Sequence, residues 1–336
     1  LGLGHVVRCL ALAGALRDRH GAGVRFAVTD DLTAQLVTKA DYPVDIKPGA
    51  ADEDEWLLGL KERLRADVLV VDVRSDLAPS TLERAQVCGC LVAVIDDPSA
   101  RRLVADLGFY PPVPEVFDLD WSGFQGTLHA GWGWVILRPQ FAARRYSRQE
   151  IVGPAKVLIA MGGADPAGLS LRTVEGLIEL GGKVELHVIV GAANRNLETL
   201  REQADLSGGL VTLHPNVEHM AGLMAEMDLA VAAFGVTAYE LAALGVPAIY
   251  LSLTDQHASA ATALVEAGAG ISLGVHTDVT ADALRSAVVS LIDSPELRAS
   301  MAAAGPSLGL GQGARNAARI LADEVVRRRI DTGVAP

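Results

Sequence analysis

Residues 229–256 read LAVAAFGVTAYELAALGVPAIYLSLTDQ, and this stretch decides the fold. Two short apolar runs, Leu229–Val231 and Ala248–Leu251, enclose a helical pattern at Tyr239–Leu244. Runs that are apolar at successive positions are typical of parallel strands that helices cover on both faces. The stretch therefore predicts a strand–helix–strand unit of a parallel sheet.

The same alternation recurs along the whole chain. Further apolar runs of this kind lie at Val24–Val28, Val68–Val71, Leu91–Ile95, Val157–Ala160 and Val184–Val190. Helical patterns lie between or after them, at residues 10–16, 171–180, 281–292 and 314–328. Because the alternation occurs in two sets, we expect an α/β protein with two doubly wound, Rossmann-like domains.

The length of 336 residues suits two domains, since single cores stop growing at roughly 250 to 300 residues. A charged stretch at residues 142–156 ends in Gly-Pro before the next apolar run, so we place an N-terminal domain at 1–150 and a C-terminal domain at 151–336. The last helix could pack back on the N-terminal domain. Residues 106–134, rich in Pro, Gly and aromatic side chains, predict a long ordered loop with short strands.

Composition narrows the possible partners. A net charge of −12 gives no basic surface for nucleic acid, so local groups such as backbone amides must hold any phosphate of a ligand. No apolar run approaches the roughly 18 residues of a membrane span, so we expect no membrane insertion and a cytoplasmic location. We expect the three cysteines, Cys9, Cys88 and Cys90, to be reduced and to lie in the core. We expect a monomer or a weak homo-oligomer.

The first candidate site is at the N-terminus, where the chain reads LGLGHVVRCLALA. Gly2 and Gly4 are spaced as at a turn from a strand into a helix, which we expect to begin near Val6, and they would allow a ligand to approach closely. His5 follows them, and an imidazole can give or take a proton near neutral pH. Arg8, on the same helix, is a candidate substrate-binding residue.

No strand precedes Leu1, although such a turn ordinarily follows one. We therefore expect about 10 to 20 further residues upstream in the natural protein, including an apolar strand. Without that strand the first sheet would lack a member, and His5 would be poorly anchored.

The second candidate site follows the apolar run that ends at Met161. Gly162 and Gly163 predict a tight turn whose amides can bind a diphosphate. Asp165 and the proline after it can cap the helix that follows. An ordinary strand–helix turn would show the same pattern, and no Lys follows as in a P-loop.

The third candidate site lies in the opening stretch. Gly235, Val236 and Thr237 follow one strand, Glu240 lies in the first turn of the next helix, and Gln256 follows the next strand. Doubly wound folds bind ligands at this edge of the sheet, so these residues should lie together there. A carboxylate such as that of Glu240 suits the two hydroxyl donors of a ribose; alternatively it compensates the helix dipole.

We expect no metal and no cofactor. Asp118-Leu119-Asp120 matches the D-x-D pattern of some metal–nucleotide sites, but acidic triplets arise by chance in an acidic chain. The histidines show no metal-ligand spacing.

Taken together, five stretches resemble a known family: GLGHVVRCLALA, GWVILRPQF, IAMGGADP, FGVTAYELAALGVPAI and DQH, spanning Gly2 to about Leu264. The chain resembles the nucleotide-sugar hydrolase and glycosyltransferase-like group that includes the UDP-sugar hydrolase of pseudaminic acid biosynthesis and the spore-coat polysaccharide biosynthesis proteins. Its second half is similar, more distantly, to the lipid-linked muramyl-peptide N-acetylglucosaminyltransferase.

The resemblance implies a glycosyltransferase-B architecture, in which two domains face each other across a cleft and the C-terminal one binds UDP. It implies that His5 is the acid/base. It also implies that Gly162, Gly163 and Asp165 lie at the diphosphate, and that Thr237, Tyr239 and Glu240 face the nucleoside and the sugar. Amides at helix starts near Gly163 and Gly235 would stabilise the leaving UDP.

One position departs from the hydrolase pattern, which has a tyrosine two residues after an Asp where this chain reads Asp72-Val73-Arg74. Our first hypothesis is hydrolysis of a UDP-linked amino or deoxy sugar, releasing UDP and free sugar for surface polysaccharide or pseudaminic-type acid synthesis. The alternatives are an inverting UDP-sugar-dependent glycosyltransferase and a non-catalytic nucleotide-sugar-binding protein.

Overall fold

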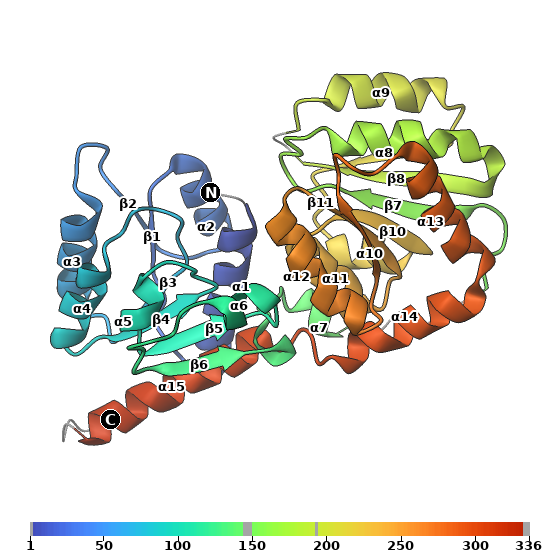
Figure 1. Cartoon of the computed structure of the whole chain (residues 1–336). Helices are drawn as coiled ribbons and strands as arrows, with labels where there is room; N and C mark the ends of the chain where they lie inside the picture. Colours follow the sequence, from blue (N-terminus) through green and yellow to red (C-terminus); the bar gives the residue numbers. More distant parts are fainter. Residues whose placement is uncertain (1–2, 144–149, 192–193, 332–336) are drawn as a thin grey trace. The chain divides into compact units, whose positions relative to one another are not determined.

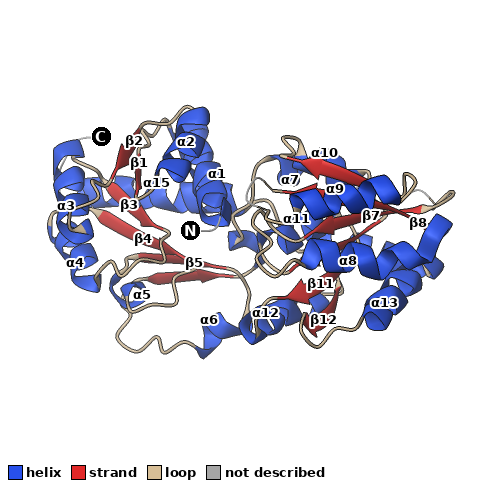
Figure 2. Cartoon of the chain, turned by 90° about the horizontal axis from the view of Figure 1, so that it is seen from above, coloured by secondary structure: helices blue, strands red, loops and turns tan. Residues whose placement is uncertain are grey.

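The computed structural model describes residues 3–143, 150–191 and 194–331. The chain divides into two compact units. The first comprises the chain up to Pro112, then Val116–Pro139 and the segment from Gly311 onward; the second comprises Val113–Glu115 and Gln140–Leu310. Each unit has parallel strands between helices, which confirms the expected doubly wound α/β class (Figures 1 and 2).

The strands of the first unit form two parallel sheets. One pairs β1 (Phe26–Val28) with β2 (Val44–Ile46), and the other has the order β3-β4-β5-β6. The strands of this second sheet are β3 (Val68–Val71), β4 (Leu91–Ile95), β5 (Leu107–Tyr110) and β6 (Thr127–Ala130). Among the described strands, none joins β1 to β3, so the strands of this unit lie in two separate sheets.

Helix α1 (Leu3–His20) packs on both of these sheets. Val6 and Ala13 belong to a small core with Tyr42 beside β1 and β2, whereas Ala11 and Leu12 belong to the core of β4 and β5. Seven further helices complete the unit: α2 (Asp31–Lys39), α3 (Glu53–Leu64), α4 (Pro79–Val87), α5 (Arg101–Val104), α6 (Pro114–Asp118), which begins in the second unit, the 3-10 helix η1 (Trp132–Trp134) and α15 (Gly313–Asp331).

The last helix, α15, packs against α1 through a stripe of small residues. Ala314, Ala317 and Ala318 are buried in the core that contains Ala11 and Leu12. At the far end of α15, Arg328 pairs with Asp106 at 2.6 Å and Arg329 pairs with Asp67 at 3.0 Å. The basic cluster at the end of the chain therefore binds acidic side chains beside the first unit's sheet.

The second unit has one six-stranded parallel sheet in the order β12-β11-β10-β7-β8-β9. Its strands are β7 (Ala155–Ala160), β8 (Val184–Val190), β9 (Val211–Pro215), β10 (Leu229–Ala233), β11 (Ala248–Ser252) and β12 (Ile271–Val275). Strands β10 and β11 are buried at every position, which explains their uninterrupted apolar sequences.

Helices cover both faces of this sheet (Figure 1). They are α7 (Gln140–Ala143), α8 (Leu169–Leu177), the 3-10 helix η2 (Ile178–Lys183), α9 (Leu197–Leu206), α10 (Met220–Ala225), α11 (Val236–Leu244), α12 (Asp255–Glu266), α13 (Ala281–Asp293) and α14 (Pro295–Ser307). Residues of α8, α9 and α13 share the main core with β7 and β8. No described helix of the chain is long and apolar enough to cross a lipid bilayer.

The strand order of the second unit fixes where a ligand would bind. From β7 the chain proceeds outward through β8 and β9, and it then returns to the other side of β7 with β10. In open α/β sheets such a reversal leaves a crevice at the carboxyl ends of the two strands, and ligands bind there. The loops after β7 and β10 therefore flank the expected site.

The loop after β8 adjoins the loop after β7 because Gly191 has no side chain. A Cβ atom at Gly191 would lie 2.1 Å from the carbonyl oxygen of Gly163. Since two backbones cannot separate without shifting both strand ends, only glycine fits at this position.

We expect Gly191→Ala to lower the free energy of unfolding by about 1–3 kcal/mol, as overpacking of a closely packed site does. Gly182→Ala is the matched control, because no atom lies within 4 Å of the Cβ position there. Urea unfolding of both variants measures the difference. Equal stability of the two would contradict the close approach of the loops.

Candidate functional site

Four side chains form a hydrogen-bonded cluster in the first unit. His5 and Arg8 lie one turn apart on α1, Asp72 follows β3 directly, and Asp96 follows β4 directly. His5 Nδ1 lies 2.6 Å from Asp72 Oδ1, and Arg8 donates from Nε and Nη2 to the two oxygens of Asp72 at 2.5 and 2.6 Å. Arg8 Nη1 also donates to Asp96 at 3.1 Å.

The contacts of His5 determine which ring nitrogen carries the proton. A distance of 2.6 Å between Nδ1 and a carboxylate oxygen is favourable only if Nδ1 bears hydrogen. Arg8 Nη2, a donor, lies 3.2 Å from the same Nδ1 and would favour a lone pair there, but the contact with the carboxylate is 0.6 Å shorter and decides the assignment. In the neutral ring Nε2 therefore keeps its lone pair, and the side chain is 20% exposed. An imidazole oriented in this way can accept a proton at Nε2.

Asp72 stays ionised although its side chain is only 2% exposed. Burial by itself would raise the pKa of Asp72, but hydrogen bonds from Arg8 and His5 and the positive charge of Arg8 lower it to about 2. Burial opposes the charged form of Arg8 too, yet its bonds to Asp72 leave the pKa of Arg8 raised. The cluster therefore holds a permanent negative charge against His5.

A buried arginine stabilises the loop that begins with Asp72. Arg101 pairs with Asp97 at 2.7 Å and donates to the carbonyl oxygens of Ser75 and Leu77, each at 2.9 Å. Asp96 itself has a left-handed backbone with φ of 50°, which is uncommon for a residue with a side chain. The loops after β3 and β4 are thus fixed to each other next to the cluster.

Two predictions for this region were wrong. Helix α1 begins at Leu3 rather than near Val6, so Gly4 and His5 lie in its first turn, whereas Gly2 lies outside the described residues. His5 is not poorly anchored, because Asp72 binds it even though the sheet is divided. The assignment of Arg8 to substrate binding stays a prediction; in the structure its guanidinium is engaged by Asp72 and Asp96.

In the second unit the predicted glycines lie at the carboxyl ends of neighbouring strands. Gly162 and Gly163 follow β7, Gly235 follows β10, and these two strands pair directly in the sheet. Gly162 has φ of +85°, which favours glycine, and no atom lies within 4 Å of the Cβ position at Gly162 or at Gly235. Both loops therefore leave open space beside the strand reversal.

Asp165 has a structural role. Its two carboxylate oxygens accept hydrogen bonds from the amides of Leu169 and Ser170 at 2.8 and 2.9 Å, and its exposed fraction is 4%. Helix α8 begins only at Leu169, so Gly163 does not lie at a helix start. The expectation that amides of this helix receive a diphosphate is therefore corrected, because Asp165 already occupies them.

Helix α11, by contrast, has no side-chain cap at its N-terminus. Gly235 is its N-cap residue, and Val236 and Thr237, both half-buried, form its first turn. The first amides of a helix lack partners within the helix, so these amides can bind an anion. Glu240 and Tyr239 are buried further along α11, and Gln256 is exposed in the first turn of α12.

The remaining predictions concern metals and cysteines. No group of three or more His, Cys, Asp or Glu side chains in the described parts of the chain could hold a metal ion. Asp120 accepts the amide of Ser122 at 2.8 Å, as in a turn.

Cys90 is buried as expected, but Cys88 is exposed rather than in the core. Burial and the charge of Asp72 raise the pKa of the Cys9 thiol.

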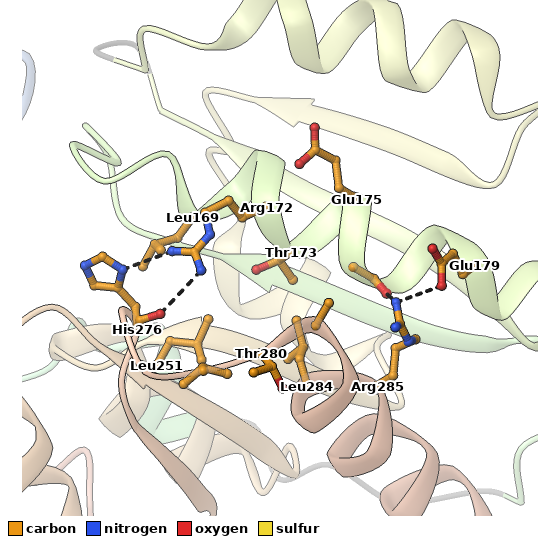
Figure 3. A pocket seen from close by; sticks show the side chains of 13 residues that line it. Leu169, Arg172, Thr173, Glu175, Glu179, Leu251, His276, Thr280, Leu284 and Arg285 are labelled. Atoms are coloured by element: carbon orange, nitrogen blue, oxygen red, sulfur yellow. Dashed lines mark hydrogen bonds and ion pairs between the residues drawn. The ribbon is translucent and has the colours of Figure 1, made fainter.

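A hollow of about 320 Å³ lies elsewhere in the second unit, between α8 and the start of α13 (Figure 3). Both arginines of its lining have partners there: Arg172 lies 3.2 Å from Nδ1 of His276, and Arg285 lies 2.9 Å from Glu179. None of the residues predicted from the sequence to bind a ligand lines it. The hollow is therefore separate from the strand reversal.

Comparison with known proteins gives the family. No protein-family model matches the chain. The UDP-N-acetylglucosamine--N-acetylmuramyl-(pentapeptide) pyrophosphoryl-undecaprenol N-acetylglucosamine transferase of Anaeromyxobacter sp. (strain Fw109-5) is 30% identical, over 97% of this chain and 92% of that protein. The chain belongs to the glycosyltransferase-B family.

Two further comparisons agree with this membership. The spore coat polysaccharide biosynthesis protein SpsG of Bacillus subtilis (strain 168) is 23% identical, over 96% of this chain and 94% of that protein. The crystal structure of Acinetobacter baumannii MurG superimposes with a TM-score of 0.68 at 19% identity, over 95% of this chain and 96% of that one. The glycosyltransferase-B fold is thus shared over nearly the whole length.

Sequence reasoning did not identify the partners of His5 in this glycosyltransferase-B chain. Asp72 and Asp96 each follow a buried strand directly, and the two strands are neighbours in the sheet. Acidic residues at the carboxyl ends of adjacent parallel strands are a signal that the sequence does contain. In the sequence alone, Asp72 is notable only as part of a departure from the hydrolase pattern.

Replacing Asp72 by Asn tests the electrostatic role of this carboxylate. Because its pKa is about 2 in the folded protein, against an ordinary 3.8, the charge stabilises the fold by about 2 kcal/mol above pH 4. This contribution declines as the pH falls from about 4 to about 2 and is absent below. Urea unfolding over this range should show the difference between wild type and Asp72→Asn shrinking towards low pH.

Asp18→Asn is the control for that measurement. Asp18 lies on the same helix and pairs with Arg17, but its side chain is 66% exposed, so its loss should change stability by less than about 0.5 kcal/mol. A difference between wild type and Asp72→Asn that stays constant with pH would show that Asp72 does not have the lowered pKa.

Proposed function

We propose that the chain transfers a sugar from a UDP-linked donor to an acceptor hydroxyl. The observation that carries the proposal is the His5–Asp72 pair, which presents an oriented imidazole base in a chain of the glycosyltransferase-B family. A relative that shares 30% identity along nearly its full length is itself named as an N-acetylglucosamine transferase. The similarity to SpsG supports a role in polysaccharide biosynthesis.

The second unit would bind the nucleotide. We assign the diphosphate to the loop at Gly162 and Gly163 and to the uncapped start of α11 at Gly235, Val236 and Thr237. Glu240 would bind the ribose hydroxyls, and Gln256, exposed after the next strand, would contact the sugar. Tyr239 would contribute its aromatic ring to this nucleotide site. The ring packs against that of Phe234, and the two centroids lie 5.9 Å apart.

The first unit would supply the base. His5 Nε2 takes the proton of the acceptor hydroxyl as that oxygen forms a bond to the anomeric carbon. The bond from the anomeric carbon to the diphosphate oxygen breaks, and its electron pair leaves with UDP. Asp72 stabilises the imidazolium that forms, because its negative charge lies 2.6 Å from Nδ1. A single displacement of this kind inverts the anomeric configuration.

Hydrolysis uses the same groups, with water in place of the acceptor. It was our first hypothesis, but the relatives favour transfer, and the chain has Asp72-Val73-Arg74 where the hydrolase pattern requires a tyrosine. A binding protein without activity would have no use for the buried charge that orients His5. These alternatives differ in whether an acceptor changes the rate and whether His5 affects it.

The test measures UDP release from a panel of UDP-amino sugars with and without candidate acceptor alcohols. We expect release that depends on an acceptor and that falls roughly 10²- to 10⁴-fold in His5→Gln. Asp72→Asn should lower kcat while leaving the KM for the donor near the wild-type value, because it acts through His5. His20→Gln, an exposed histidine at the end of the same helix, is the control.

Each other outcome has a distinct meaning. Equal release without any acceptor would show a hydrolase, and unchanged release in His5→Gln would show that His5 is not the base. If no UDP-sugar binds, the proposed function is wrong.

A further inference from the structure

The loop after β8 brings polar side chains to the same edge of the sheet as the two glycine loops. Its first residue, Gly191, lies against the backbone of Gly163. The amide of Asn194 donates to the carbonyl of Gly191 at 3.1 Å, and Asn194 Oδ1 accepts the amide of Asn196 at 2.8 Å. Arg195 thus lies between two residues whose positions are fixed beside the loop at Gly162 and Gly163.

Arg195 differs from the other basic residues described in the second unit. Its side chain is exposed, and it has no hydrogen-bond or ion-pair partner among the described residues. The other arginines are engaged: Arg172 with His276, Arg201 with Glu198, Arg285 with Glu179, and Arg298 with backbone carbonyls. The lysines lie at the opposite end of the strands, Lys156 near the start of β7 and Lys183 before β8.

Asn194 provides a second, independent observation. Its side chain is only 9% exposed, and its Nδ2 is buried without a hydrogen-bond partner in the part of the chain that the structure describes. A buried donor without a partner is unfavourable, so an acceptor from a ligand would stabilise it. The oxygens of a phosphate are acceptors of this kind.

The negative charge of the diphosphate leaving group would be stabilised by a positively charged donor such as Arg195. Asp165 occupies the amides of α8, which leaves the uncapped α11 and the glycine loop, both of them neutral dipoles, in a chain of net charge −12. A guanidinium matches phosphate oxygens in charge and geometry, and a preformed donor stabilises charge that develops as the bond breaks.

We infer that Arg195, with Nδ2 of Asn194, binds the diphosphate of the donor and stabilises it as the leaving group. This inference rests on the proposed function. As the bond between the anomeric carbon and the diphosphate oxygen breaks, the electron pair passes to that oxygen, and the guanidinium of Arg195 neutralises the added charge. No proton is transferred to or from Arg195 in this step.

Calorimetric titration of the full chain with UDP and with uridine tests the inference. A hydrogen bond to a charged group predicts that Arg195→Gln weakens UDP binding roughly 10- to 100-fold. Uridine has no phosphate, so its affinity should be unchanged, which also shows that the variant is folded. Arg201→Gln removes the same charge from the following helix and should bind UDP as the wild type does.

Asn194→Asp is the second variant, since it keeps the oxygen that accepts the Asn196 amide and replaces the Nδ2 donor by a carboxylate oxygen. This variant too should bind UDP more weakly, while its affinity for uridine should be unchanged. If wild type binds UDP and both variants bind it equally well, the inference is wrong and the proposed function stands. If wild type binds neither UDP nor any UDP-sugar, the proposed function fails and the inference fails with it.

Discussion

The carboxylate of Asp72 lies at the end of β3 with almost no contact with water, and it binds His5 through one oxygen and Arg8 through both. An isolated charge at this depth would be strongly unfavourable, so Asp72 and Arg8 depend on each other. Their pairing holds α1 against the end of β3, while Arg8 reaches Asp96 at the end of β4. The orientation of His5, and with it the assignment of a base, follows from this one buried pair.

Much of the architecture was predictable because the inner strands of parallel sheets are buried on both faces. The runs at Val68–Val71, Leu91–Ile95 and Val184–Val190 have the same bounds in the structure. Strands β2, β9 and β12 were missed, because they lie at sheet edges, are only partly buried and have weaker apolar patterns. Strand β5 is fully buried and lies in the segment rich in Gly and aromatic residues for which we expected a long ordered loop with short strands, without bounds for any strand.

The candidate site was predictable only where the signal is local. Gly162 and Gly235 were found because strand, glycine and helix follow one another in the sequence. Asp72 could not be connected to His5 in this way, since 67 residues separate the two and only the fold brings them together. Asp165 shows the opposite difficulty: a cap and a phosphate contact have the same local sequence, and only its bonds to Leu169 and Ser170 distinguish them.

The packing of α15 against α1 has a consequence for how the chain folds. The core of the first unit contains Ala11 and Leu12 from the start of the chain and Ala314, Ala317 and Leu321 from its end. During synthesis this core stays incomplete until the last helix leaves the ribosome, whereas the whole of the second unit has been made by Leu310. The unit that comes second in the sequence can therefore finish folding before the unit that comes first.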